Sequence, residues 1–119
     1  MTFRVALCVT LLLAATPVTV RADDRSAAKQ EAQFGVDVAR RGLWREAIYR
    51  WERAIELDPT YASALNNLGV AYEHEGQLDK ARVAYEKALA IEPDNIQIRQ
   101  NYDLFKEINE RTAAKTEKP

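Results

Sequence analysis

Apolar side chains recur along residues 28–108 at helical spacing, and short polar breaks divide them into five stretches. Leu65, Leu68 and Tyr72, for example, follow one another at intervals of three and four residues, which places them on one helical face. Glycine lets the chain reverse direction, and proline lacks the N–H group that a continuing helix needs. The breaks contain Gly42, Pro59, Gly76 and Pro93. The pattern predicts an all-α chain with helices over residues 28–41, 45–57, 61–75, 79–91 and 96–111.

The first four predicted helices form two copies of one unit. Residues 28–61 and 62–95 match each other with a period of 34 residues. The matched pairs are Gly35 and Gly69, Gly42 and Gly76, Ala47 and Ala81, Trp51 and Tyr85, Ala54 and Ala88, and Pro59 and Pro93. Small residues in these pairs allow two helices to approach closely, so each copy is predicted to be a helix–turn–helix unit.

This pattern resembles the tetratricopeptide repeat family, whose period is about 34 residues. In that family a Leu-Gly pair, a Tyr and a helix-breaking Gly are followed by an Ala, an aromatic residue, an Ala and a Pro. The second copy supplies all of these as Leu68, Gly69, Tyr72, Gly76, Ala81, Tyr85, Ala88 and Pro93. The first copy departs from the pattern at Val38, which replaces the Tyr, and at Glu31, which stands where the second copy has Leu65. The resemblance implies a right-handed α-solenoid.

The fifth predicted helix, residues 96–111, does not continue the repeat. Asp103 and Lys106 stand where the second copy has its small and aromatic residues. Its apolar face consists of Ile98, Tyr102 and Phe105. A terminal unit that is apolar inside and polar outside resembles the helix that caps such arrays. Residues 112–119 are charged or small and are predicted to be disordered.

Residues 1–22 have the features of an export signal. Arg4 precedes an apolar run over residues 5–15, and small residues stand at Val20 and Ala22. The run is shorter than the roughly 20 residues that span a bilayer. We therefore expect an exported protein of a bacterial periplasm, with residues 23–27 as a polar lead-in. The alternative is an inner-membrane anchor formed by an uncleaved signal.

Charge and cysteine content narrow the class of partner. Removal of residues 1–22 would leave 15 basic and 18 acidic side chains, a net charge of −3. This charge argues against nucleic acid or an anionic membrane as the main partner. The single cysteine, Cys8, lies within the predicted signal, so the remaining chain could form no disulfide. The chain also has no Asn-x-Ser/Thr acceptor, which favours the periplasm over a eukaryotic secretory route.

Candidate catalytic groups do not form a recognisable set in the sequence. His74 is the only histidine and falls near a predicted helix end, whereas metal sites need several N, S or O ligands. No glycine-rich phosphate loop is present, and the acidic pairs fall on predicted solvated stretches. We therefore expect a protein that is not an enzyme and holds no cofactor or metal. An accessory subunit of an enzyme complex is a remote alternative.

The first helix of each unit has a second face, well over 100° away from its core residues. In the family this face lines a concave groove that takes a peptide or a helix from a partner protein. The groove residues implied here are Ala32, Val36, Arg40, Asn66, Val70, Glu73, Gln100 and Leu104. A clamp for a C-terminal carboxylate is excluded, because only Asn67 matches the five residues that form it. The sequence thus favours a non-catalytic adaptor or scaffold.

Two other interpretations stay open at this point. Val36, Val70 and Leu104 form an apolar line with the repeat period, but isolated exposed apolar residues are normal, and Leu104 could pack under the cap. The protein could instead be a self-associating scaffold, since two repeats are fewer than the three that usually stabilise an array. In that case a homo-oligomer would cover Trp44, Ile48 and Ile55, which have no preceding repeat beside them.

Overall fold

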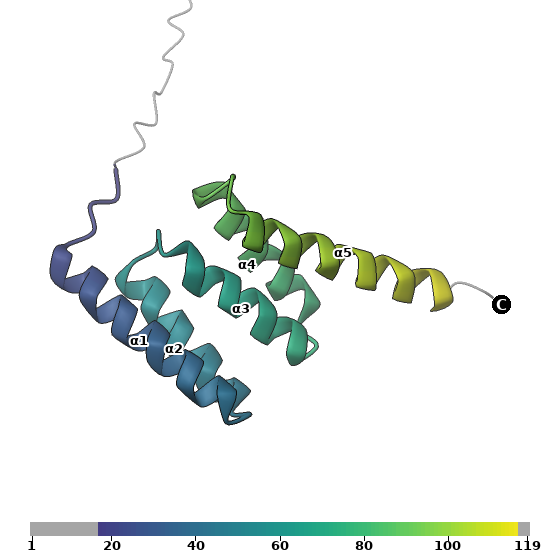
Figure 1. Cartoon of the computed structure of the whole chain (residues 1–119), viewed down its shortest axis with the longest axis horizontal. Coiled ribbons are helices and arrows are strands. Elements are labelled where there is room, and N and C mark those ends of the chain that lie inside the picture. The colour runs from purple at the N-terminus through teal and green to yellow at the C-terminus, as the bar shows by residue number, and fades with distance from the viewer. Residues whose placement is uncertain (1–16, 117–119) are drawn as a thin grey trace, which may run out of the picture.

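The computed structural model describes residues 17–116, and five α-helices account for most of this range (Figure 1). The helices are α1 (Ala22–Arg40), α2 (Trp44–Leu57), α3 (Ala62–His74), α4 (Leu78–Ile91) and α5 (Ile96–Thr116). The predicted all-α fold is confirmed. None of these helices is both long enough and apolar enough to cross a membrane.

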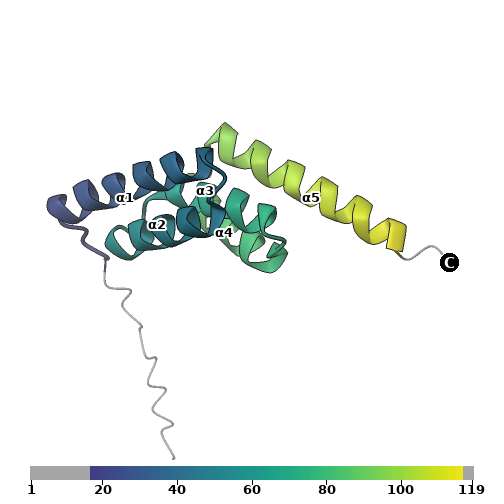
Figure 2. The same ribbon diagram turned by 90° about the horizontal axis from the view of Figure 1, so that it is seen from below.

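The helices form two layers, with α1, α3 and α5 in one and α2 and α4 in the other (Figures 1 and 2). Helices α1 and α2 pack together as one pair, and α3 and α4 as the next. The two pairs are joined mainly through α2 and α3, while α5 rests on α4 and α3. This stacking of equivalent helix pairs is the predicted α-solenoid.

Glycine closes the turn after the first helix of each pair. Gly42 and Gly76 have φ values of +79° and +74°, a region that side chains with a Cβ rarely adopt. The next residue in each turn donates its N–H to a carbonyl five residues back, from Leu43 to Val38 and from Gln77 to Tyr72. These bonds satisfy carbonyls that the helix end would leave unpaired.

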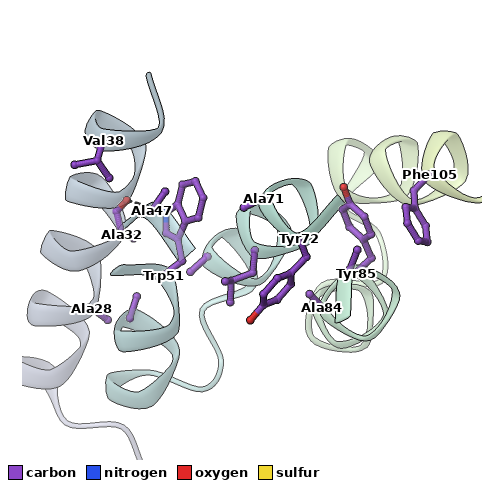
Figure 3. Packing of buried hydrophobic residues seen from close by; sticks show 14 residues of the cluster. Ala28, Ala32, Val38, Ala47, Trp51, Ala71, Tyr72, Ala84, Tyr85 and Phe105 are labelled. Atoms are coloured by element: carbon purple, nitrogen blue, oxygen red, sulfur yellow. Dashed lines mark hydrogen bonds between the residues drawn. The ribbon is translucent and has the colours of Figure 1, made fainter. Parts of the chain in front are cut away.

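A large aromatic side chain from the second helix lies against a glycine of the first in each pair. A Cβ built on Gly35 would lie 2.6 Å from Trp51, and one built on Gly69 would lie 2.6 Å from Tyr85. Both rings are almost fully buried within the chain's core (Figure 3). The small residue therefore sets how closely the two helices of a pair approach.

The first half of α5 covers the open side of the second repeat. Ile98 and Phe105 are 2% and 0% exposed, and Tyr102 is partly buried. The Phe105 ring lies 5.5 Å from that of Tyr85 and 6.2 Å from that of Tyr102. The expected apolar face of this helix is thus confirmed. Figure 2 shows the remainder of α5 extending beyond the other helices.

Helix ends differ from the prediction at both ends of the described range. Residues 23–27, predicted as a polar lead-in, lie within α1, and Asp23 and Asp24 occupy its first turn. Negative charge there is favourable because it opposes the positive end of the helix dipole. Residues 112–116, predicted to be disordered, continue α5 as exposed helix. Most of the predicted export signal, residues 1–16, lies outside the described residues.

Candidate binding surfaces

The predicted apolar line is partly available on the α1–α3–α5 layer. Val70 on α3 is 38% exposed, and Leu104 on α5 is 56% exposed. Val36 on α1 is partly buried and packs against the core. Arg40 and Gln100 are also exposed, so they add polar groups to the same helices. The predicted apolar line is therefore exposed on α3 and α5 but not on α1.

Two predicted groove residues are buried and present no free side chain. Ala32 is 5% exposed, and its carbonyl accepts a 3.0 Å hydrogen bond from Trp51 Nε1. Asn66 is 7% exposed, and its Oδ1 accepts a 3.1 Å bond from Asn101 Nδ2 on α5. The expectation that these side chains line the groove is therefore wrong. They position Trp51 and α5, because a buried polar group needs a partner.

Glu73 is also engaged with its own chain. Its Oε2 accepts a 3.0 Å hydrogen bond from the Tyr85 hydroxyl, which joins α3 to α4. Burial, followed by this bond and the negative charge, raises the pKa of Tyr85. Glu73 is only partly buried, and this hydrogen bond ties its carboxylate to α4.

A tyrosine–glutamate hydrogen bond joins each repeat to the helix that follows it. Tyr72 on α3 donates to Glu52 on α2 at 2.5 Å, and Tyr102 on α5 donates to Glu86 on α4 at 2.7 Å. The two glutamates are 34 residues apart, but the two tyrosines are 30 residues apart. The cap thus makes the same bond from one turn earlier, which compensates for Lys106 at the position equivalent to Tyr72.

A cleft that the hydrophobic pattern does not predict opens in the α2–α4 layer. It has a volume of about 760 Å³ and lies between α2 and α4, with α3 as its floor. Its residues are Glu52, Ile55, Glu56, Pro59, Leu65, Leu68, Tyr72, Asp79, Lys80, Val83, Ala84 and Lys87. The floor is apolar, whereas the two walls carry charged side chains. The apolar periodicity predicts the floor residues as core, and it contains no information about the opening between α2 and α4.

Residues proposed for self-association are covered by the second repeat. The Trp44 ring stacks on His74, with centroids 4.3 Å apart and an angle of 24° between the planes. Ile48 and Ile55 are partly buried against the core. No repeat precedes the first one, but Trp44 already has His74 of α3 as a neighbour, and Ile48 and Ile55 pack against the chain's own core. These three side chains are therefore less free for a second copy than expected.

The outer end of the first repeat carries aromatic and charged side chains instead. Phe34 and Tyr49 are 44% and 52% exposed, and the Arg50 guanidinium lies 4.3 Å from the Phe34 ring centre. Arg50 also pairs with Glu31 at 3.2 Å and with Glu46 at 2.9 Å. A polar outer face of this kind is what a terminal repeat requires for solubility.

Among residues 17–116, no three His, Cys, Asp or Glu side chains gather closely enough to hold a metal ion. His74 instead contacts the Trp44 ring, and its Nδ1 lies 3.8 Å from Glu75.

Stacked helix pairs with glycine turns and a capping helix define a helical-repeat protein. Residues 62–95 match the family model described as tetratricopeptide repeat, and residues 39–76 match a second model described as TPR repeat. The chain belongs to the tetratricopeptide repeat family. Its fold supports protein–protein interaction as the general role, since stacked repeats present extended binding surfaces.

Two known proteins are similar in sequence to part of this chain. The chain is 35% identical over 85 residues to the chloroplastic tetratricopeptide repeat domain-containing protein PYG7 of Arabidopsis thaliana, which covers 71% of this chain and 28% of that protein. It is 31% identical over 83 residues to mouse sperm-associated antigen 1, covering 70% of this chain and 8% of the other. The chain thus spans under a third of these relatives.

Solved structures agree on the arrangement of the helices. The crystal structure of MamA superposes with a TM-score of 0.66 at 33% identity, covering 71% of this chain and 50% of MamA. The Arabidopsis OM64 TPR domain gives a TM-score of 0.69 at 19% identity, covering 74% of this chain and 73% of that domain. At 19% identity, the similarity to the OM64 domain concerns the fold alone.

Proposed function

We propose that the protein is a non-catalytic adaptor that binds a segment of a partner protein along the α1–α3–α5 layer. The observation that carries this proposal is the exposure of Val70 and Leu104 on successive helices of one layer. The partly buried Val36 extends the same line onto α1. Apolar contacts of this kind, flanked by polar groups, suit a helix or an extended segment laid across a groove.

Substitution of Val70 separates this surface from the core. Val70→Asp should leave the fold nearly unchanged, because surface substitutions usually alter stability by about 0.5 kcal/mol or less. It should weaken binding at least several-fold, since it places an unpaired carboxylate in an apolar contact. Leu68→Asp, two residues away and only 4% exposed, should unfold the domain. Helicity and thermal melting of both variants check the structural half of this prediction.

Partner capture checks the functional half. Tagged wild-type protein and Val70→Asp are used to pull proteins from an exported fraction, and the captured proteins are compared by mass spectrometry. Leu104→Asp, which changes another exposed residue of the layer, should reduce capture of the same proteins. If the folded Val70→Asp variant captures them as well as wild type does, this surface is not the binding site.

Export belongs to the same proposal. The apolar run over residues 5–15, with small residues at Val20 and Ala22, supports cleavage after Ala22 and a periplasmic adaptor that begins at Asp23. An inner-membrane anchor is the alternative if the signal is retained. Mass analysis of the N-terminus of protein purified from cells distinguishes the two, and an intact Met1 contradicts cleavage.

A further inference from the structure

We propose that the cleft between α2 and α4 is a second protein-binding site, which takes an amphipathic α-helix with basic residues along one edge and acidic residues along the other. This site opens in the α2–α4 layer and shares no exposed residue with the α1–α3–α5 surface. The two sites could therefore hold different segments at the same time.

The floor of the cleft provides the apolar contact. Leu65 and Leu68 from α3 are almost fully buried beneath it, while Val83 on α4 is 48% exposed. Ile55 and Ala84 complete the apolar part from the two flanking helices. A volume of about 760 Å³ lies within the range of roughly 300–1,000 Å³ that is typical of binding pockets. The cleft is thus large enough to receive several side chains.

The two walls carry opposite charges. Glu52 and Glu56 line the α2 side, whereas Lys80 and Lys87 line the α4 side together with Asp79. Among residues 17–116, no ion pair shorter than 4 Å joins one wall to the other. Glu52 accepts a hydrogen bond from the Tyr72 hydroxyl and Glu56 pairs with Arg53 on its own helix, so neither glutamate has a partner on the opposite wall. A ligand with one basic and one acidic edge would be complementary to both walls.

The spacing of these charges and the state of the backbone favour a helix as the ligand. Glu52 and Glu56 are one turn apart, and Lys80 and Lys87 are two turns apart, which corresponds to roughly 6 and 10 Å along a helix axis. Side chains at i, i+4 and i+7 of a bound helix repeat at the same intervals. Helices α2 and α4 use their own N–H and C=O groups internally, so they offer little to an extended backbone, whereas a helix satisfies its own.

Three synthetic helical peptides with the same leucine stripe test the charge requirement. One has a basic and an acidic edge, the second has two acidic edges, and the third has two basic edges. Because a helix can enter in either direction, the peptides differ in edge composition and not in edge order. Fluorescence anisotropy should show that the mixed peptide binds about tenfold more tightly than the others. Equal affinities for the three peptides would overturn the proposal.

Reversal of one wall should change the preference. Lys80→Glu combined with Lys87→Glu makes both walls acidic, and both lysines are exposed, so the fold should be retained. This variant should bind the doubly basic peptide most tightly. The control is Lys29→Glu combined with Lys115→Glu, which changes the net charge equally at exposed residues outside the cleft. A preference that shifts equally in the control would mean that net charge alone decides binding, and the proposal would fail.

Substitution of Val83, the exposed apolar residue that α4 contributes to the cleft, locates the peptide. Val83→Arg should lower affinity for the mixed peptide at least tenfold, whereas Val70→Asp should leave it unchanged, with helicity confirming that both variants fold. The opposite result would place the peptide on the α1–α3–α5 surface and overturn the inference. Mass in solution provides a further check, because a dimer that Val83→Arg dissociates would mean that a second copy of the chain occupies the cleft. The inference and the proposed function can therefore fail independently.

Discussion

Phe105 anchors the capping helix, and its replacement by alanine should greatly destabilise the protein. Its side chain is 0% exposed and packs against the rings of Tyr85 and Tyr102. Leu104, the preceding residue on the same helix, is 56% exposed. The two residues form a matched pair, because truncation of either to alanine leaves the helix propensity of α5 favourable.

The expected loss follows from the burial. Replacing a buried Phe by Ala removes its transfer free energy and leaves a cavity, at a cost of about 3–5 kcal/mol. A protein with about 100 ordered residues has a total unfolding free energy of about 5–15 kcal/mol. Phe105→Ala should thus lower the melting midpoint by at least about 12 °C, since each kcal/mol shifts a domain of this size by about 4–8 °C. Leu104→Ala should change stability by about 0.5 kcal/mol or less.

Urea unfolding followed by circular dichroism measures both variants, and hydrogen exchange shows where the structure opens. In Phe105→Ala the amides of α5 should lose protection before those of α1, because the cap opens locally before the array unfolds. If the unfolding free energies of Phe105→Ala and Leu104→Ala differ by less than about 1 kcal/mol, Phe105 does not hold α5 in place.

Two further predictions concern close packing and pH. Gly69→Ala should lower the free energy of unfolding by about 1–3 kcal/mol despite the better helix propensity of alanine, because its Cβ would lie 2.6 Å from the buried Tyr85 ring. Unchanged urea unfolding would show that the ring can move. Burial raises the pKa of Tyr72 and Tyr85 above the ordinary tyrosine value of about 10. Above that pH the unfolded chain binds fewer protons than the folded one, so stability should fall as pH rises, and Tyr72→Phe should weaken this dependence in pH-dependent melting.

The repeat could be predicted from the sequence because its signals are local and recur with a fixed period. Gly35 and Gly69 face rings from Trp51 and Tyr85, and that pairing of small and large residues is visible in the residues themselves. Helix ends were harder to predict, because periodicity detects only the face that packs. The first turn of α1 and the last turns of α5 are exposed, so their helical form depends on propensity and end charges.

The groove could be predicted only in part, because the face of a helix does not determine whether a side chain is free. Ala32 and Asn66 lie on the expected arc, but a Trp51 N–H group and an Asn101 amide from other helices bond to them. Those partners lie 19 and 35 residues away in the sequence. Their approach depends on how the helices stack, which a single-helix projection leaves out.

The cleft has an origin that can be traced by comparing equivalent residues of the two repeats. Val83 and Ala84 on α4 occupy the positions of Tyr49 and Arg50 on α2. On α2 these larger side chains cover the outer end of the first repeat, and Arg50 forms its ion pairs there. On α4 the same face is turned toward the first repeat, and the smaller side chains leave the space unfilled.

Because of this difference, the size of the side chain at position 84 determines how open the cleft is. Arginine at that position would restore the residue that the first repeat carries and would direct a long side chain into the opening. The cleft therefore does not follow from stacking two identical units. Its space arises because the second unit has small residues where the first has large ones. Its charge pattern arises because Lys80 and Lys87 stand opposite Glu52 and Glu56.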